Sequence, residues 1–273
     1  MKCYFLISIH IIIISSFSSF FSQDVIRFHQ TNGYSFQIPS LIYNNGGGVL
    51  DSVWIDDMNV ISYQQSPVSS TPGSLLYDAE GNQYTTIILG NGQQWMAENL
   101  DVSHFSNGDT INISNWNSTN IVDWYSIGLL DGENIDKFGK LYVNDVIYDT
   151  RNVCPTGWHV PTFNEWDLLI GYVDNNSNLG VTWGVESRYG GGILKDSSLN
   201  YWLTPNGLAV NSIGFCALPA SSLGTKANFW AVIPGQGVNY VYGQTRSLFF
   251  NNGTIYKNTQ NSGSYNSIRC LKN

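Results

Sequence analysis

The chain has 273 residues, enough for one large domain or two modest ones, and its formal net charge is −8. The acidic excess excludes nucleic acid and anionic lipid as partners, because both are bound through lysine and arginine. Only 12% of the residues are charged, whereas there are 16 tyrosines and nine tryptophans. Such aromatic residues fit either an extracellular binding surface or a rigid β-rich core.

Residues 1–22 form a short basic start, an apolar run and then small serines. This order is typical of a secretory signal peptide; a membrane anchor is the alternative, because about 20 apolar residues can span a bilayer. The serines, together with His10 inside the run, favour the signal peptide. We therefore expect a secreted, extracellular or cell-surface protein with no membrane insertion after signal cleavage. Its net charge would be −9, since Lys2 is the one charged residue removed.

Residues 23–63 are predicted to form a small β-strand module. Apolar and polar residues alternate on both sides of Asn32-Gly33, which indicates a hairpin, and "VLDSVWIDD" supplies a further strand. Residues 64–74, "QQSPVSSTPGS", are rich in serine, proline and glycine and are typical of a linker.

A second domain is predicted over residues 75–273. Two strands are expected around Gly81-Asn82, and a second, shorter helix around residues 93–100. Residues 101–139 are polar, rich in aromatic residues and without periodicity, so they are interpreted as an ordered surface excursion.

A helix is predicted to begin within "CPTGWHVPTFNEW", residues 154–166. Thr162 and Glu165 stand three apart, as in a capping box, so Glu165 has a structural role. His159 lies on a short strand as a packed or surface histidine. Apolar residues then recur at helical spacing at Phe163, Trp166, Leu169, Ile170 and Val173.

Residues 190–192 are three consecutive glycines, interpreted as part of a glycine-rich loop. A phosphate-binding loop is not indicated, since no Gly-Lys-Ser or Gly-Lys-Thr follows and Lys195 alone does not replace it. Turn-separated short strands are expected from there to the end of the sequence.

Three cysteines follow the predicted signal peptide: Cys154, Cys216 and Cys270. In an oxidising compartment two of them can pair. A bond between Cys154 and Cys270 would close the C-terminal half, and Cys216, in "IGFCALPAS", is interpreted as a buried free thiol on a core strand.

Several segments occur in an order that resembles the Fibrobacter succinogenes major paralogous domain: "WMAENL", "FGKLY", "CPTGWHVPTFNEWDLL", "GGILKD", "NSIGFCALPAS", "FWAV" and "SIRCLKN". The resemblance covers about residues 75–273 and points to secreted and surface proteins of Bacteroidetes-like bacteria. It implies an α+β, C-type-lectin-like fold, similar also to formylglycine-generating enzymes. That fold has a twisted antiparallel sheet, one or two helices and long irregular loops, and it pairs Cys154 with Cys270.

The lectin-like resemblance implies little about activity, because fold does not give function. Calcium-dependent sugar binders carry an acidic residue or glutamine before a proline, where this chain has Thr204-Pro205-Asn206. Calcium is therefore considered only at "DGENID", through Asp131, Glu133 and Asp136, since calcium takes such oxygen ligands. No other cofactor is expected.

No catalytic motif is recognisable, because His29, His104 and His159 lie outside nucleophile motifs. We expect a non-catalytic binding protein for a glycan or protein at the cell surface. A carbohydrate-active enzyme with unidentified carboxylates, or a structural surface component, is the alternative. The predicted ligand-binding residues of the late loops are Trp230, Asn239, Tyr240, Tyr242, Tyr256 and Tyr265.

Overall fold

The structure, a computed structural model, describes residues 27–29, 35–37, 53–56, 59–62, 68–112, 116–118, 138–198, 200–222, 224–237 and 242–273. The chain divides into two compact units, residues 1–64 and 65–273. The predicted signal peptide lies outside the described residues. Among the helices that are described, none is both long and apolar enough to cross a membrane.

The first unit contains two antiparallel strand pairs. Strand β1 (Arg27–His29) pairs with β2 (Ser35–Gln37), which confirms the hairpin predicted around Asn32-Gly33. Strand β3 (Val53–Asp56) pairs with β4 (Asn59–Ser62).

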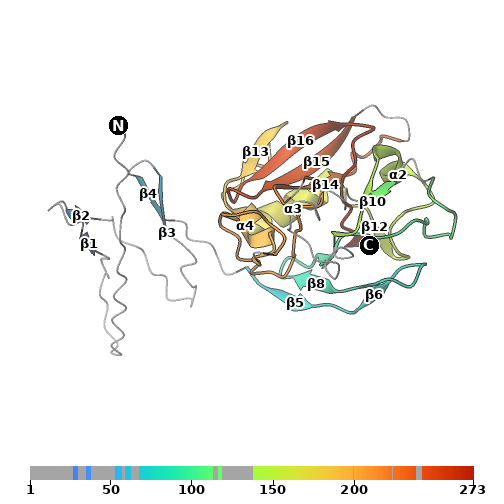
Figure 1. The fold of residues 1–273 in the computed structure, drawn as a ribbon, viewed down its shortest axis with the longest axis horizontal. Helices are drawn as coiled ribbons and strands as arrows, with labels where there is room; N and C mark the ends of the chain where they lie inside the picture. The colour runs from blue at the N-terminus through green and yellow to red at the C-terminus, as the bar shows by residue number, and fades with distance from the viewer. Residues whose placement is uncertain are drawn as a thin grey trace. The chain divides into compact units, whose positions relative to one another are not determined.

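Two antiparallel sheets form the frame of the second unit (Figure 1). The five-stranded sheet has the order β12 (Trp158–His159), β17 (Leu271–Lys272), β9 (Gln94–Met96), β8 (Thr86–Leu89) and β5 (Ser70–Pro72). The four-stranded sheet has the order β13 (Gly184–Ser187), β16 (Ile255–Asn261), β15 (Tyr242–Phe249) and β14 (Lys226–Ala231).

Shorter elements complete the second unit. The predicted strand pair around Gly81-Asn82 is confirmed as β6 (Leu76–Tyr77) and β7 (Gln83–Tyr84). The others are the strand pair β10 (Trp116–Ser118) and β11 (Lys140–Tyr142), and the helices α2 (Asn144–Tyr148), α3 (Phe163–Val173) and α4 (Gly190–Leu194). The architecture is therefore mixed α+β with mostly antiparallel strands, as predicted.

The helix predicted around residues 93–100 is wrong, because strand β9 occupies this segment. All three residues of β9 are buried, and Trp95 pairs with Ile87 of β8 and with Leu271 of β17. Because every residue of β9 is buried, the strand lacks the alternation of buried and exposed residues by which a half-buried strand is recognised.

The predicted linker, residues 64–74, contains the edge strand β5, which pairs with β8. Helix α3 holds the residue that precedes β5, since the Tyr172 hydroxyl donates to the Ser69 carbonyl (2.7 Å) and accepts from the Ser69 N–H (2.9 Å). Proline at the end of this strand is tolerated because β5 lies at a sheet edge. The second unit therefore begins before residue 75.

Helix α3 forms as predicted. Thr162 Oγ1 accepts from the Glu165 N–H (3.3 Å), and Glu165 Oε2 accepts from the Thr162 N–H (2.8 Å), which completes the capping box. The buried face consists of Trp166, Leu169, Ile170 and Val173.

The glycine-rich loop predicted at 190–192 is instead the start of helix α4. A Cβ atom at Gly191 would lie 2.7 Å from the Thr254 carbonyl oxygen, and one at Gly192 would lie 2.2 Å from the Leu208 carbonyl oxygen. The glycines therefore let this short helix approach neighbouring backbone closely, which outweighs their low helix propensity.

The core lies around α3, between the two sheets (Figure 1). The ring of Trp166 lies 4.9 Å from Trp95 of β9 and 5.6 Å from Phe229 of β14, measured between centroids. Phe215 packs edge-on against all three rings. These aromatic contacts join one sheet to the helix and the helix to the other sheet.

The predicted disulfide is confirmed. Cys154 and Cys270 are bonded across 116 residues, and both are fully buried. The bond lies beside strand β17, whose Leu271 pairs with His159 of β12. It therefore ties the segment that precedes α3 to the last strand of the sheet.

Candidate functional site

A pocket of 520 Å³ lies beside the edge of the five-stranded sheet. Strands β5 and β8 form one side of it, and the segment 213–218 forms another. Its size falls in the usual range of small-ligand sites, about 300–1,000 Å³. The lining residues are Ser70, Pro72, Thr85, Thr86, Ile87, Ala97, Glu98, Asp196, Tyr201, Ile213, Gly214, Cys216 and Leu218.

The walls of the pocket are mainly apolar and belong to the core. Ile87, Ile213 and Leu218 are buried, and Tyr201 packs edge-on against Phe138 at 5.6 Å between ring centroids. The Ser70 hydroxyl donates to the Ile213 carbonyl (2.8 Å), which joins the edge strand to the opposite wall. The pocket is therefore built on packed elements and does not depend on a free loop.

Two carboxylates, Glu98 and Asp196, line the pocket, and neither is fully buried. Glu98 accepts from both the N–H and the hydroxyl of Thr85, each at 2.7 Å. Asp196 Oδ1 accepts from the N–H of Ser198 at 2.9 Å. Each carboxylate is thus oriented by a neighbouring residue and can accept hydrogen bonds from hydroxyl or ammonium groups of a ligand.

The loop that supplies one wall has an unusual backbone. Asn206, Leu208, Asn211 and Cys216 all have positive φ angles, between 46° and 65°. Residues other than glycine seldom adopt this conformation, and such departures concentrate at functional sites.

Cys216 corrects a prediction. It lies outside the strands, is only half-buried and lines the pocket. Asn211 fixes it, because the Asn211 amide donates to Cys216 Sγ (3.0 Å) and accepts from the Cys216 N–H (2.9 Å). The expectation of a core strand arose from the apolar neighbours Phe215 and Ala217, which are indeed buried.

Arg269 supports this wall from inside the core. Its fully buried guanidinium donates to the carbonyl of Cys216 (2.9 Å) and to that of Phe215, and its Nε donates to Asn99 (2.9 Å). It also lies over the Phe215 ring, 4.6 Å from the centroid. Burial lowers the pKa of Arg269 to about 10, so the side chain remains charged at neutral pH.

Lys195, which precedes Asp196 in the sequence, holds together the loops on the other side of the pocket. Its ammonium group donates to the carbonyls of Gly207 (2.7 Å), Phe249 (3.0 Å) and Asn252 (2.9 Å). Burial lowers the pKa of Lys195 to about 7, against the preference of three carbonyl acceptors for the ammonium form. Lys195 thus organises the loops behind the pocket and does not line it.

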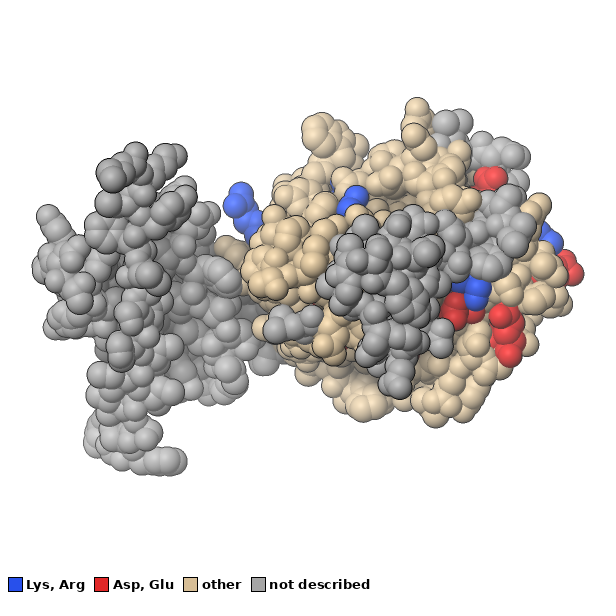
Figure 2. All heavy atoms as spheres, viewed as in Figure 1, with Lys and Arg blue, Asp and Glu red and all other residues tan. Residues whose placement is uncertain are grey.

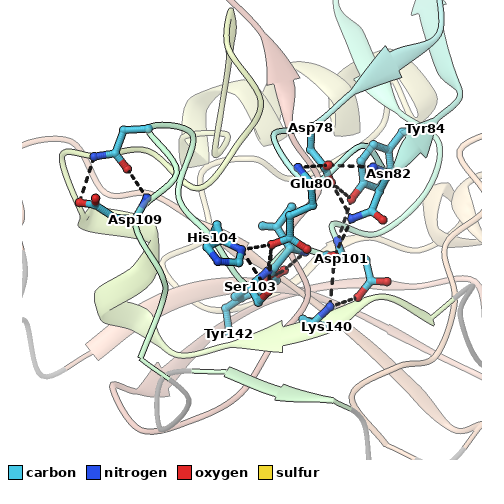
Figure 3. Close-up of polar contacts among 12 residues, drawn as sticks. Asp78, Glu80, Asn82, Tyr84, Asp101, Ser103, His104, Asp109, Lys140 and Tyr142 are labelled. Carbon is cyan, nitrogen blue, oxygen red and sulfur yellow. Dashed lines mark hydrogen bonds and ion pairs between the residues drawn. The ribbon is translucent and has the colours of Figure 1, made fainter.

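A second polar cluster joins the β6–β7 turn to residues 101–104 (Figure 3). Asp78 accepts from the N–H groups of Glu80 and Asn82, each at 2.9 Å, and from the Tyr84 hydroxyl at 2.7 Å. Burial and the bond to Asp78 raise the pKa of Tyr84. In the same cluster, Lys140 Nζ lies 2.7 Å from the Asp101 carboxylate. These contacts are made within the protein and fix the turn.

Glu80, Ser103 and His104 contain the residue types of a catalytic triad but not its arrangement (Figure 3). Nδ1 of His104 lies 2.8 Å from Glu80 Oε1 and 3.3 Å from Ser103 Oγ, so both partners meet the same ring nitrogen. A triad base needs its acid and its nucleophile on opposite nitrogens. Burial raises the pKa of Glu80, but the bonds from His104 and Ser103 outweigh it and hold the pKa below the ordinary value.

The residues predicted to bind a ligand in the late loops differ in their exposure. Trp230 corrects the prediction, because it is fully buried in β14 and its Nε1 donates to the Tyr142 carbonyl at 2.6 Å. Tyr256 and Tyr265 are half-buried, whereas Tyr242 is 51% exposed. Asn239 and Tyr240 lie outside the described residues.

The calcium hypothesis stays a prediction, since Asp131, Glu133 and Asp136 lie outside the described residues. Within the part of the second unit that is described, no three histidine, cysteine or acidic side chains gather as metal ligands would.

Sequence reasoning missed Glu98, Asp196 and Tyr201, because distant segments bring them to one pocket. One local signal was present: "TPNGLAVNSIG", residues 204–214, is rich in residues that tolerate positive φ, and the positive-φ wall follows from it.

Comparison with known proteins gives a family. A family model described as the Fibrobacter succinogenes major domain matches residues 89–272, more than half of the chain. The matched range includes helix α3, the disulfide and the 213–218 wall of the pocket. No curated protein and no solved structure matches the chain. The chain belongs to the Fibrobacter succinogenes major domain family.

Proposed function

We propose that this chain is a secreted or cell-surface binding protein, without catalytic activity, that holds a glycan in the pocket beside β5 and β8. The single observation that carries the proposal is the pocket itself, with apolar walls, the Tyr201 side chain and the carboxylates Glu98 and Asp196. Sugar rings have apolar faces and hydroxyl edges, so they match walls and carboxylates together.

The surface charge supports a neutral or basic ligand. Uncharged side chains cover most of the described face of the second unit seen in Figure 2, and the lining residues include no lysine or arginine. An anionic ligand would meet the two carboxylates without a cation at the pocket wall. The segment 1–22, with its pattern of a signal peptide, supports export of the chain.

The finer fold that we propose is C-type-lectin-like. Its support is the bond between Cys154 and Cys270 at the two places that the resemblance implies, together with one main helix packed on antiparallel strands. A crystal structure of residues 65–273 tests this assignment by superposition on lectin-like domains.

Chemical modification of Cys216 tests the pocket without a mutation. Cys216 is the free thiol among the described residues, and alkylation would place a bulky group at the pocket wall. We expect mature protein to bind glycans on an array, with and without calcium, and alkylated protein to lose that binding. We also expect bound glycan to slow the alkylation. Undiminished binding after alkylation would place the ligand elsewhere, and a blank array in both conditions would argue for a protein partner.

A carbohydrate-active enzyme is the second candidate, because two carboxylates line one pocket, as glycoside hydrolysis requires. Against it, both oxygens of Glu98 already accept from Thr85. The double variant Glu98→Gln, Asp196→Asn separates the two functions. Hydrolysis of an oligosaccharide by the unaltered protein, abolished in the variant, would establish the enzyme in place of the binding protein.

A further inference from the structure

Trp183 is exposed in a way that sets it apart from the other tryptophans whose burial is described. Its exposed fraction is 76%, whereas Trp95, Trp158, Trp166, Trp202 and Trp230 are all buried, at 5% or less. A large indole left in water forgoes the stabilisation that burial would give, about 1.5–3 kcal/mol for a large apolar side chain. Exposed tryptophans are typical of contact surfaces, since the ring offers a large rigid area.

The loop that carries Trp183, residues 174–184, is tied down at its start. The Asp174 carboxylate accepts from the Asn176 N–H (2.9 Å) and from the Ser187 hydroxyl (2.6 Å), and the Asn178 N–H donates to the Glu186 carbonyl (2.6 Å). These bonds join the loop to strand β13 in two places.

The base of the loop is equally firm. The buried Glu186 carboxylate lies 2.7 Å from Arg246 Nε and 3.5 Å from Lys257 Nζ, which pins β13 to β15 and β16. Burial raises the pKa of Glu186 against the attraction of these two cations. Leu179 packs against the core from within the loop. Trp183 is thus displayed on a fixed platform, and little conformational entropy is lost when a ligand binds.

The polar surroundings of Trp183 indicate which ligand it meets. Asn175, Asn176, Asn178 and Thr182 of the same loop are exposed, whereas the core of a protein–protein interface is more apolar than the rest of the surface. Asparagine amides both donate and accept hydrogen bonds, as sugar hydroxyls require. The negative face of an indole attracts the polarised C–H bonds of a sugar ring.

We propose that the loop 174–184 is a second glycan-contact surface, on which Trp183 stacks against a sugar ring of a neutral polysaccharide. This site goes beyond the pocket, since none of the pocket-lining residues comes from this loop. The combination of aromatic rings and asparagine amides, which the sequence predicted as a binding site in the late loops, is proposed here for the loop after α3.

Affinity electrophoresis of the whole mature chain tests the proposal, with xylan, mannan, laminarin and hydroxyethyl cellulose in the gel. We expect at least one polysaccharide to retard the unaltered protein, and Trp183→Ala to weaken that binding about tenfold, the upper end of an aromatic contact. Trp183→Phe should keep most of the retardation. Matched controls are Leu168→Ala and Leu75→Ala, which remove other exposed apolar side chains, 61% and 50% exposed, and should leave the retardation unchanged.

The outcomes separate this site from the pocket. Retardation that survives alkylation of Cys216 but not Trp183→Ala supports the loop, whatever the pocket binds. The proposal is overturned if Trp183→Ala is retarded like the unaltered protein, or if no polysaccharide retards the unaltered protein. It is equally overturned if Trp183 is needed only for co-sedimentation with phosphatidylcholine vesicles, which would make the loop a membrane contact.

Discussion

Lys195 illustrates how a single buried charge can organise several loops. Its ammonium group has three carbonyl partners from two separate segments, Gly207 on one side and Phe249 and Asn252 on the other. The same nitrogen lies 5.3 Å from the centroid of the Trp202 ring. The three carbonyls satisfy the hydrogen-bonding capacity of this buried ammonium group, and removing it takes a donor from each of them.

Lys195→Met should lower the free energy of unfolding by about 3 kcal/mol, because it leaves the carbonyls of three half-buried residues without their ammonium donor. Urea denaturation followed by tryptophan fluorescence measures this loss. Lys272→Met is the matched control, since Lys272 is exposed and its ammonium donates to the Gln94 side-chain oxygen; it should cost less than about 1 kcal/mol. Equal stabilities for the two variants would contradict the role of Lys195.

The burial of individual tryptophans could not be predicted from the sequence. Trp183 follows Thr182 and Trp230 follows Phe229, and neither neighbour tells whether the indole is buried. Trp230 is covered because β14 is packed on both faces, with five of its six residues buried. Trp183 precedes Gly184, whose φ of +111° redirects the chain into β13. Neither circumstance can be recognised from neighbouring residues, so Trp230 was wrongly predicted to be exposed.

Among the elements, helix α3 depends on its first turn. Glu165 accepts from Thr162 and lies 3.0 Å from Nε2 of His159. Burial raises the pKa of Glu165, but the bonds from His159 and Thr162 outweigh this and lower the pKa from 4.5 to about 2. The bonds to Glu165 and Asn273 raise the pKa of His159 above 6.5.

The sign of the pH dependence follows from these directions. A carboxylate with a lowered pKa stabilises the fold above its unfolded value and loses that effect as the pH falls from 4.5 to about 2. A histidine with a raised pKa stabilises the fold below pH 6.5 and loses that effect as the pH rises through its folded value. The pair should therefore stabilise α3 most between about pH 4.5 and 6.5.

Glu165→Gln keeps an acceptor for the Thr162 N–H and removes only the charge. We expect it to lower the unfolding free energy by about 1–2 kcal/mol at pH 5.5, allowing for solvent screening, and by much less at pH 2. Urea midpoints across this range measure the difference. In a His159→Asn background, the stabilising effect of the Glu165 charge should no longer decline as the pH rises above 6.5. A constant difference from pH 2 to 8 would show that the charge does not matter.

Helix α4 depends on close backbone packing. Gly191→Ala should cost about 1–3 kcal/mol, because the new methyl group would meet the carbonyl oxygens of Thr254 at 2.7 Å and Gly253 at 2.8 Å. Gly180→Ala is the matched control, since its nearest contact would be Asn178 Oδ1 at 3.8 Å. Thermal unfolding of both variants provides the comparison, and equal melting temperatures would contradict the packing argument.

These two helices also show which elements can be predicted. Helix α3 has a cap, an apolar face of regular spacing and 11 residues, so its local signals agree with its packing. Helix α4 has three glycines in five residues, and it forms because the neighbouring backbone leaves room for nothing larger. Helix α3 can be predicted from its local sequence, whereas the formation of α4 depends on tertiary structure.

For the whole second unit, the disulfide is the main covalent constraint. Replacing Cys154 and Cys270 by serine should destabilise the fold by about 2–5 kcal/mol, since a loop of 116 residues is then no longer closed in the unfolded chain. Cys216→Ser should cost far less. Calorimetry under non-reducing conditions distinguishes them, and a double variant as stable as Cys216→Ser would refute this constraint.

The disulfide could be predicted from the sequence, whereas the pocket could not. Cysteine number and redox compartment limit the pairing to a few possibilities. The pocket requires that Ser70, Glu98, Asp196 and Cys216 meet, and no local pattern links residues so far apart. The family resemblance supplied the frame but no ligand, because a fold does not by itself give a function.

The place of strand β17 has a consequence for synthesis. Strand β17 (Leu271–Lys272) lies between β12 and β9 in the sheet. Both neighbouring strands are synthesised more than 100 residues earlier, so their edges that face β17 remain unpaired until these two residues emerge from the ribosome. A growing chain therefore exposes two sheet edges together with the apolar rings behind them, a state prone to aggregation. The five-stranded sheet of the second unit can therefore be completed only after Leu271 and Lys272 have left the ribosome.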